Sequence, residues 1–413
     1  MTRANSSRLR RARLVVPAAA ALGLLGVVPG LGVAQASSRH PAAHNDGGCP
    51  KAESLVPGTT WHKHTLATGL VMSSGSTTDS NGVVSMHVLR INLADQNISL
   101  QPLMHSLAER SPLSTLAANR PRLVAATNTG YFDFRTGDPT QPLIANKVPE
   151  VMSSAHQAVV GIGTNGLAES GTVWWAALLT AGKHTHAVLS KNELDPPSGL
   201  AVYNSKWGSS PVPAHWGDEI RGVVNGVLTS VSQSRWGTAL PSNGYLLVGH
   251  GQSASNWLSG IPLGTKISLA SSVVTSAPKP FVQAYGVGLE VVQKPGVIRT
   301  GFGCDSIGTK QPARTEIGLS HGGRMVTIAI VADHRGTSTH GLDENQMSEL
   351  MVQLGSSQAF AFDGSGSTEL LARLGGTQPL TLENYPADGQ ERPMPVGLGV
   401  FSSPVKHKAK HKH

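Results

Sequence analysis

Polar side chains follow several apolar runs of this 413-residue sequence, at points where strands are expected to end. These polar clusters lie at residues 128–133, at Arg314, and at residues 333–335, 363–368 and 384–393. Binding and catalytic residues are often found in loops that a rigid strand holds in place. Together the clusters supply carboxylates, arginines, amides and hydroxyls, the groups needed to hold an anionic substrate and to hydrolyse it.

The loop at residues 363–368 reads Asp-Gly-Ser-Gly-Ser-Thr. Such a loop exposes backbone N–H groups and hydroxyls, which suit an anion such as phosphate. An ordinary tight turn is the alternative. The loop does not match an EF-hand, because Thr368 and Leu374 occupy the positions that need Gly and Glu. It also lacks the G-x-S-x-G pattern of a nucleophile elbow. The sequence has no H-E-x-x-H motif and no Cys/His zinc spacing, so we expect no metal site and no cofactor.

Taken in order, the clusters resemble the phosphodiester glycosidase family, whose motifs span roughly residues 85–402. The family's N-G-G-Y-F segment resembles Asn128-Thr129-Gly130-Tyr131-Phe132, and its R-x-x-I-G strand resembles Arg314-Thr315-Glu316-Ile317-Gly318. Its D-G-R segment before an E-L helix is similar to Asp333-His334-Arg335 before Glu349-Leu350, and its D-G-G-G-S-T loop is similar to residues 363–368. Its N-x-P-x-D…E-R-P run resembles Asn384-Tyr385-Pro386-Ala387-Asp388 with Glu391-Arg392-Pro393. Thr129, His334 and Ser365 stand where the family has glycine. Ser365 adds a side chain where backbone is expected to approach the ligand.

The resemblance implies cleavage of the bond between a sugar anomeric carbon and a phosphodiester oxygen. An oxocarbenium-like transition state needs a nearby carboxylate, and a phosphate leaving group departs as a stable anion. We therefore assign the catalytic roles to Asp363, Glu391 and Arg314. Substrate binding is assigned to the remaining polar residues of the motifs: Asn128, Asp333, Arg335, Ser367, Thr368 and Arg392.

Each of these assignments has a structural alternative. Arg314 and Glu391 could form an ion pair, and Asp363 and Asn128 could each cap a turn. The leading hypothesis for function is a secreted hydrolase of sugar-1-phosphate diesters, similar to GlcNAc-1-phosphodiesters, in cell-wall or capsular polymers. The alternatives are a wall- or glycan-binding protein without catalysis and an exopolysaccharide-assembly protein, both with the same fold.

The elements that must position these residues are short strands and few helices. Alternation of apolar side chains predicts a strand at residues 85–93, with residues 98–103 as its hairpin partner. Further strands are expected at residues 122–127, 314–319, 325–331, 359–362 and 396–401. Helices are expected at residues 111–119, with Ser111 as N-cap, and at residues 342–354. Strands and helices mix without a regular βαβ repeat, so the predicted class is α+β, with mixed sheets and few helices.

The middle of the sequence, residues 155–300, consists of short apolar runs separated by turn residues, which is typical of short strands. It contains six of the seven tryptophans: Trp174, Trp175, Trp207, Trp216, Trp236 and Trp257. These side chains could stack on sugar rings. The alternative is that they fill a β core that is poor in Phe and Tyr.

The two ends differ from the body in charge. Five arginines among the first 13 residues and four lysines among the last eight account for the net charge of +8, leaving 24 basic against 25 acidic side chains elsewhere. Residues 1–36 are expected to be a signal peptide, because arginines precede an apolar run and an Ala-Gln-Ala cleavage pattern. Residues 37–60 are expected to be a flexible lead-in, residues 61–403 the glycosidase-like domain, and residues 404–413 a disordered Lys/His tail.

Export has consequences for partners and for disulfide formation. The protein is expected to be extracellular or wall-associated, with its tail on an anionic cell wall and no membrane contact after signal cleavage. A body without clustered Lys and Arg excludes nucleic-acid binding. An oxidising compartment permits a disulfide between Cys49 and Cys304, the alternative being two free thiols.

Overall fold

The computed structural model describes residues 58–79, 81–194, 196–231, 239–298, 311–334, 337–375 and 379–402. The expected signal peptide, tail, Cys49, Cys304, Trp236 and Arg335 lie outside these ranges. Strands dominate the described residues, and the helices and 3₁₀ turns are few. They are α1 (Leu113–Ala117), α2 (Gly251–Ser259), α3 (Glu344–Gln353), η1 (His321–Gly323) and η2 (Ser365–Ser367).

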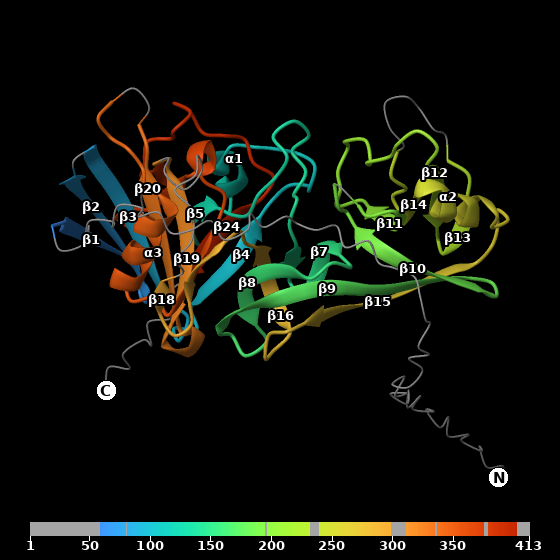
Figure 1. Cartoon of the computed structure of the whole chain (residues 1–413), viewed down its shortest axis with the longest axis horizontal. Coiled ribbons are helices and arrows are strands. Elements are labelled where there is room, and N and C mark those ends of the chain that lie inside the picture. Colours follow the sequence, from blue (N-terminus) through green and yellow to red (C-terminus); the bar gives the residue numbers. More distant parts are fainter. Residues whose placement is uncertain are drawn as a thin grey trace, which may run out of the picture. The chain divides into compact units, whose positions relative to one another are not determined.

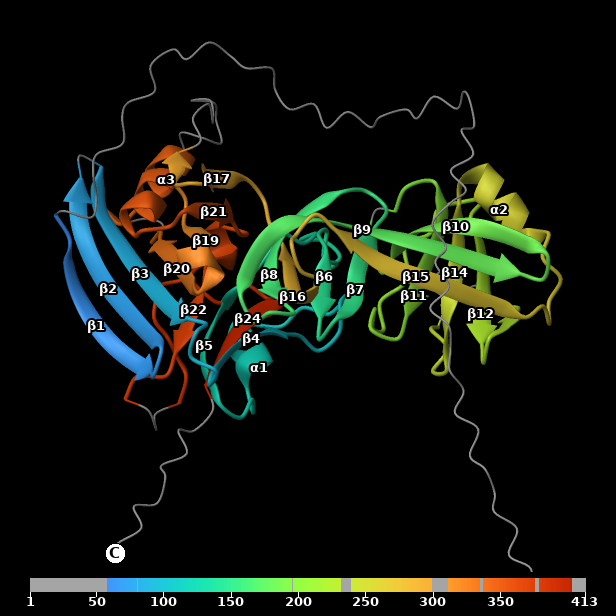
Figure 2. The ribbon, with the colours of Figure 1, turned by 90° about the horizontal axis from the view of Figure 1, so that it is seen from below.

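One sheet brings together strands from both ends of the described chain. It contains, in spatial order, β1 (Thr60–Ala67), β2 (Leu70–Asp79), β3 (Gly82–Asn92), β20 (Met325–Ala332), β19 (Arg314–Ser320), β21 (Gln358–Ala361), β17 (Glu290–Gln293) and β18 (Val297–Ile298). Figure 2 shows β1, β2 and β3 side by side at one edge. The predicted pairing of β19 with β20 around the His321 turn is confirmed, with Arg314 opposite Val331.

Strand β20 is buried along almost its whole length because both faces of the sheet are covered. Ile328 and Ile330 pack into one apolar cluster, whereas Ala329 and Val331 pack into another that includes residues of α3. Successive side chains of a strand point to opposite faces, so an uninterrupted apolar run is what this position requires. The end of β19, where Arg314 lies, is therefore held by a rigid sheet.

A second sheet comprises the strands from the middle of the chain. It contains, in order, β13 (Val227–Thr229), β12 (Glu219–Val224), β14 (Gly244–His250), β11 (Gly199–Asn204), β10 (His184–Lys191), β7 (Val148–Ser153), β6 (Leu143–Ala145), β16 (Phe281–Gly286), β8 (Gln157–Gly163), β9 (Ala168–Ala181) and β15 (Ile267–Thr275). Figures 1 and 2 show β9 and β15 as long neighbouring strands. The prediction that strands fill this region is confirmed, although β9 is longer than the short runs suggested.

The tryptophans of this region serve different purposes. Trp175 and Trp207 are buried in apolar clusters, as the core interpretation predicts. Trp216, by contrast, is fully exposed. Neither interpretation of the tryptophans therefore holds for all of them.

The third sheet is the smallest and carries the first predicted motif. It contains, in order, β23 (Thr381–Leu382), β22 (Leu370–Ala372), β5 (Leu123–Asn128), β24 (Gly397–Ser402) and β4 (Ile98–Leu103). The predicted hairpin between β3 and β4 is wrong, because β4 pairs with the distant β24. Turn residues at 94–97 suggested a hairpin, but the turn redirects the chain into another sheet.

Helix α1 begins differently from the prediction. Pro112, not Ser111, is the N-cap, and it provides no side-chain hydrogen bond to the helix. Instead Glu391 accepts hydrogen bonds from the Ser114 backbone N–H at 2.8 Å and from the Ser114 hydroxyl at 2.6 Å. A distant carboxylate thus satisfies a donor at the helix start, which a local capping rule does not reveal.

Helix α3 lies beside β17, β18 and β19 (Figures 1 and 2). Its N-terminus is stabilised by a capping box. The Asp343 carboxylate accepts from the Gln346 N–H at 2.8 Å, and the Gln346 side chain accepts from the Asp343 N–H at 3.0 Å. The predicted helix and its buried face, including Met347 and Leu350, are confirmed. Gly355 ends it with φ near +85°.

We expect Asp343→Ala to lower the free energy of unfolding by about 1 kcal/mol, because it removes the carboxylate that caps α3. Ser111→Ala is the matched control and should change stability little, since Ser111 caps no helix here. Urea denaturation of both variants gives the comparison. Equal losses of stability in the two variants would contradict the assignment of Asp343 as the cap of α3.

The expected class holds in its general form, with mixed sheets and few helices. The label α+β fits loosely, because α1, α2 and α3 are short and do not form a separate layer. Within the part of the chain that the structure describes, no helix has both the length and the apolar character needed to cross a bilayer.

Candidate active site

The ends of β5, β19 and β21 meet at Asn128. This buried amide donates to the Asp363 carbonyl at 2.6 Å and accepts from the Thr315 hydroxyl at 2.8 Å. It also accepts from the Glu369 N–H at 3.4 Å. Both the NH₂ group and the carbonyl oxygen of the amide are thus hydrogen-bonded within the chain, so Asn128 holds the loop at residues 363–368 in place. Its predicted role in binding substrate directly stays a prediction.

Asp363 lies two residues after the end of β21 and is 6 % exposed. Oδ1 accepts from the Gly364 N–H at 3.0 Å, while no described residue hydrogen-bonds Oδ2. Burial raises the pKa of Asp363, although Ser367 and Arg392 act in the opposite direction. A buried carboxylate oxygen without a well-placed donor is costly unless something else completes the site. Asp363 is therefore the strongest candidate for contact with a ligand.

Arg392 lies beside Asp363 and is oriented by three neighbours. Its Nε donates to Asp388 at 2.8 Å, its Nη1 donates to the Ser367 hydroxyl at 3.2 Å, and its guanidinium carbon lies 4.9 Å from the Phe134 ring centroid. A Cβ on Gly366 would lie 1.9 Å from Asp388 Oδ2 and 2.0 Å from Arg392 Nη2. Gly366 is thus required for this ion pair to pack against the loop.

Glu369 is part of this site but was missed by the sequence motifs. It is fully buried, and its Oε1 accepts from the Arg392 backbone N–H at 2.6 Å. No described residue hydrogen-bonds its Oε2. Burial raises its pKa to about 8, so at neutral pH it is mostly protonated. The only sequence signal for Glu369 was its position as a single acidic residue directly before the apolar run Leu370-Leu371-Ala372.

We expect the raised pKa of Glu369 to make stability fall as pH rises. The unfolded chain releases this proton near pH 4.5, whereas the folded protein keeps it up to about pH 8. The stabilisation is therefore fully present below pH 4.5 and is lost between these values, by at most about 1.4 kcal/mol per pH unit. Urea denaturation at several pH values from 5 to 8 gives the free energy of unfolding as a function of pH. Its slope against pH should be shallower in Glu369→Gln than in wild type, and unchanged in Glu383→Gln. An unchanged slope in Glu369→Gln would contradict the assignment.

Arg314 belongs to a neighbouring buried ionic cluster. Its Nε donates to the Leu342 carbonyl at 3.0 Å, and its Nη1 donates to Glu344 in a short contact. Burial raises the pKa of Glu316, and the nearby Glu344 raises it further. Burial likewise raises the pKa of Glu344, against the effect of Arg314. No described residue hydrogen-bonds Arg314 Nη2, which leaves one donor for a ligand.

Tyr131 lies close enough to Glu344 and Asp363 for their charges to act on its hydroxyl. Burial raises the pKa of its hydroxyl to about 12, and the charges of Glu344 and Asp363 contribute. A Cβ on Gly288 would lie 2.7 Å from the Tyr131 hydroxyl. The glycine therefore lets the ring pack closely, and the hydroxyl is available as a neutral donor.

The remaining predicted residues divide into those near Asp363 and those elsewhere. Ser367 and Thr368 are buried in the same loop, and no described residue hydrogen-bonds the Thr368 hydroxyl. Glu391 has both oxygens engaged by Ser114 at α1, so its contacts favour a capping role; catalysis by Glu391 stays a prediction. The alternative ion pair of Arg314 with Glu391 is wrong, because Arg314 pairs with Glu344.

Asp333 follows the end of β20 and is half-buried. Its neighbour His334 stacks on Tyr385 with ring centroids 3.6 Å apart, so the 333–335 and 384–393 motifs meet here. Arg335 lies outside the described residues. Binding of substrate by Asp333 and Arg335 stays a prediction.

Ser365, at a family glycine position, has a φ of +55°. This left-handed conformation is one that glycine adopts without cost and other residues adopt rarely. The loop therefore keeps the backbone shape that glycine would allow. Thr129, at another family glycine position, donates through its hydroxyl to the Val396 carbonyl at 3.0 Å.

Two hollows lie close to these motifs. One, of about 20 Å³, is lined by residues that include Thr129, Gly130 and Tyr131. The other, of about 550 Å³, lies between α1 and β22 and is lined partly by Ser114 and Leu371. Asp363 and Arg314 line neither of them. The contacts that unite the candidate site are those made by Asn128 and Arg392.

Residues 218–401 match the family model of the phosphodiester glycosidases. This stretch includes four of the five motifs quoted from the sequence, and the first motif, at residues 128–132, precedes it. The resemblance to the phosphodiester glycosidase family is therefore confirmed over residues 218–401. No curated protein matches the chain.

Among the solved structures that match this chain, two from bacteria have TM-scores above 0.5. A hypothetical protein from Synechocystis has a TM-score of 0.68 at 19 % identity, with 83 % of this chain and 64 % of that chain covered. A putative exported protein from Burkholderia pseudomallei K96243 has a TM-score of 0.60 at 18 % identity, with 78 % of this chain and 74 % of that chain covered. The zebrafish N-acetylglucosamine-1-phosphodiester alpha-N-acetylglucosaminidase catalytic domain, auto-inhibited by its pro-peptide, has 0.45 at 15 %, with 84 % and 89 % covered. The chain thus spans less than two thirds of the Synechocystis protein, and at these identities the likeness concerns the fold alone.

Proposed function

We propose that this protein is an exported hydrolase that cleaves the glycosidic bond of sugar-1-phosphate diesters. The observation that carries the proposal is the buried Asp363 carboxylate, with Oδ2 left for a ligand and Arg392 beside it. The match of residues 218–401 to the phosphodiester glycosidases supports the same reaction class.

In the proposed reaction Asp363 stabilises positive charge at the anomeric carbon. The bond from this carbon to the phosphodiester oxygen breaks, and its electron pair leaves with the phosphate monoester. Water then adds to the carbon and loses a proton. A carboxylate next to an oxocarbenium-like centre is what this transition state requires. The raised pKa of Asp363 means that the carboxylate is less well solvated than in water and gains more from such a centre.

The departing phosphate is held by donors of the 363–368 loop and by Arg392. The guanidinium already bonds the Ser367 hydroxyl, and the Thr368 hydroxyl is unused by the described residues. Asp388 and the Phe134 ring fix the orientation of the guanidinium. Because phosphate leaves as a stable anion, positioned donors suffice without a strong general acid. Glu369 positions Arg392 by holding its backbone N–H.

Exposed aromatic side chains support a sugar as the other part of the substrate. Phe134 and Tyr385 are 56 % and 46 % exposed, and each belongs to a segment that contributes to the site. Tyr131 is 38 % exposed, although its hydroxyl end packs against Gly288. Phe134 packs beneath Arg392, and Tyr385 packs on His334. Aromatic rings with one exposed face are suited to stacking on the apolar face of a sugar ring.

The test is incubation of the protein with a GlcNAc-1-phosphodiester, with free GlcNAc measured by chromatography. The proposal predicts release of GlcNAc by wild type and its loss in Asp363→Asn. A wild-type protein that releases no sugar from this substrate or from a panel of other sugar-1-phosphodiesters would contradict it.

A glycan-binding protein without catalysis is the second candidate. The exposed aromatics favour it as much as they favour a hydrolase. Calorimetry with a non-hydrolysable phosphonate analogue separates the two. Tight binding of the analogue without any turnover of the phosphodiester would support this second candidate.

For location, we propose that the exported protein is retained on the cell wall by its Lys/His tail, residues 404–413. Support comes from the charge of that segment, with four lysines among its last eight residues. Deleting the tail should release more protein from isolated walls at low salt, because screening weakens such contacts at high salt. Equal retention with and without the tail would contradict this.

A further inference from the structure

A group of two histidines and one aspartate lies where β12 begins and β14 ends, outside the candidate active site. The antiparallel pairing places Glu219 opposite Gly249, so Asp218 and His250 are the next facing positions beyond that pair. A tight turn brings His215 back, with the Asp218 N–H donating to the His215 carbonyl at 3.1 Å. The backbone thus brings the three side chains together.

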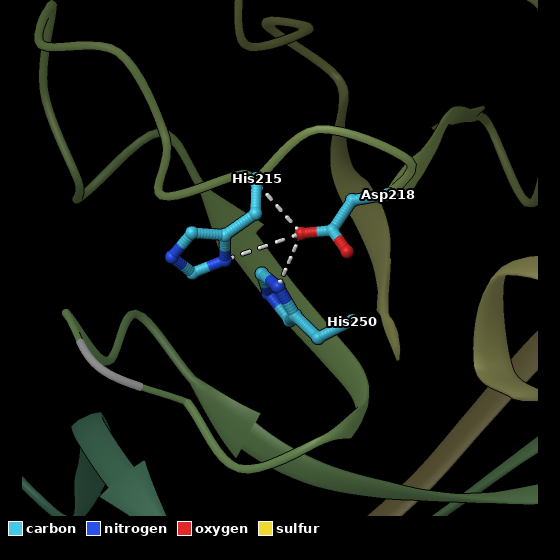
Figure 3. A group of neighbouring side chains, drawn as sticks. All are labelled: His215, Asp218 and His250. Carbon is cyan, nitrogen blue, oxygen red and sulfur yellow. Dashed lines mark hydrogen bonds and ion pairs between the residues drawn. The ribbon is translucent and has the colours of Figure 1, made fainter. Parts of the chain in front are cut away.

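Figure 3 shows ring nitrogens of His215 and His250 both facing the same carboxylate oxygen, Oδ2 of Asp218. Asp218 Oδ2 lies 2.8 Å from His250 Nδ1 and 3.6 Å from His215 Nδ1. The ligand atoms of all three residues lie within 4.8 Å of one another. Tetrahedral zinc with bonds of 2.0–2.1 Å separates its ligands by about 3.3 Å. Zinc therefore requires a longer Asp218–His250 separation and a shorter Asp218–His215 separation, each by a few tenths of an ångström, and the His215 side chain is 76 % exposed.

The carboxylate is held in a fixed orientation by two backbone N–H groups. Asp218 Oδ2 accepts from the His215 N–H at 2.8 Å, and Oδ1 accepts from the Gly251 N–H at 3.1 Å. A carboxylate ligand has to be deprotonated to bind a metal, and aspartate, with an ordinary pKa of about 3.9, meets this condition at neutral pH.

A helix cap alone does not account for the group. Asp218 does satisfy the first N–H of α2 through Gly251, and His250 fits beside it. His215 adds nothing to that cap, yet its ring nitrogen faces the same carboxylate oxygen from an exposed turn. Two imidazoles and one carboxylate favour zinc over calcium or magnesium, which prefer oxygen ligands.

We propose that His215, Asp218 and His250 bind one zinc ion, with water as the fourth ligand. The site fastens the turn at residues 215–218 to the junction of β14 and α2. A metal that binds the folded state only also raises its stability. None of the three residues belongs to the motifs of the candidate active site, so this inference does not depend on the proposed reaction.

The test measures zinc bound by the full chain with His407, His411 and His413 replaced by alanine, which removes metal binding by the tail. After dialysis against zinc, elemental analysis should find one zinc per chain, and the melting temperature should rise. Cobalt as a substitute should give the visible absorption of a tetrahedral site.

His215→Ala on this background should weaken zinc binding at least tenfold. Its side chain is exposed, so the variant is expected to fold. His62→Ala, at an exposed histidine of β1, is the matched control and should bind zinc as before. Absence of zinc in the tail-substituted protein, or equal affinity in His215→Ala and His62→Ala, would overturn the proposal.

Discussion

Asp363→Asn is expected to reduce the turnover of a GlcNAc-1-phosphodiester by about 10³-fold or more while the protein stays folded. The substitution keeps the shape of the side chain but removes the negative charge that stabilises the anomeric centre. Folding should be preserved, because Asp363 is held through its main chain, by Asn128 at its carbonyl and by Thr129 at its N–H. Steady-state kinetics and the melting temperature give the two readouts.

Glu150→Gln is the matched control for this prediction. Glu150 is a carboxylate buried to a similar degree, and burial raises its pKa as well. It lies in β7 of the second sheet, outside the candidate site. Its turnover should be close to wild type. Turnover in Asp363→Asn equal to that of Glu150→Gln would remove Asp363 from the mechanism.

Arg314→Ala is expected to lower the free energy of unfolding by about 3–5 kcal/mol, the cost of leaving a buried carboxylate without its partner. The carboxylate is Glu344, whose side chain is 5 % exposed beside Arg314. The loss should be smaller at pH 5 than at pH 8, because the raised pKa of Glu344 lets a proton neutralise it. Urea denaturation at both pH values measures this.

A double variant separates the structural from the catalytic role of Arg314. Arg314→Met with Glu344→Met replaces the pair by apolar side chains of similar size, which commonly restores stability. If Arg314 also contacts the phosphate through Nη2, the double variant regains stability but not turnover. Recovery of both would show that Arg314 is structural only.

The sequence predicted most of the elements that carry the site. Strands β5, β19, β20, β21 and β24 and helix α3 were expected within one or two residues, because their apolar periodicity is strong and their ends carry Gly, Pro or polar residues. The pairing of β4 was not predictable in the same way, since its partner β24 lies almost 300 residues away. Local patterns do not encode such long-range pairing.

For the site, motifs located Asp363, Ser367 and Arg392, which the structure brings together. They assigned Glu391 to catalysis, although its carboxylate binds Ser114. They missed Glu369, because its effect arises from burial, which no motif encodes. They also missed His215, Asp218 and His250, since pairing of β12 with β14 joins ligands that are 32 residues apart along the chain.

The most direct test of the central claim is hydrolysis of a GlcNAc-1-phosphodiester in ¹⁸O-labelled water, with both products analysed by mass spectrometry. The account predicts that the label appears in the anomeric hydroxyl of free GlcNAc and that the phosphate monoester carries none, because water attacks the sugar carbon. Label in the phosphate product would show that the phosphorus–oxygen bond breaks instead, and would contradict a glycosidase built around Asp363.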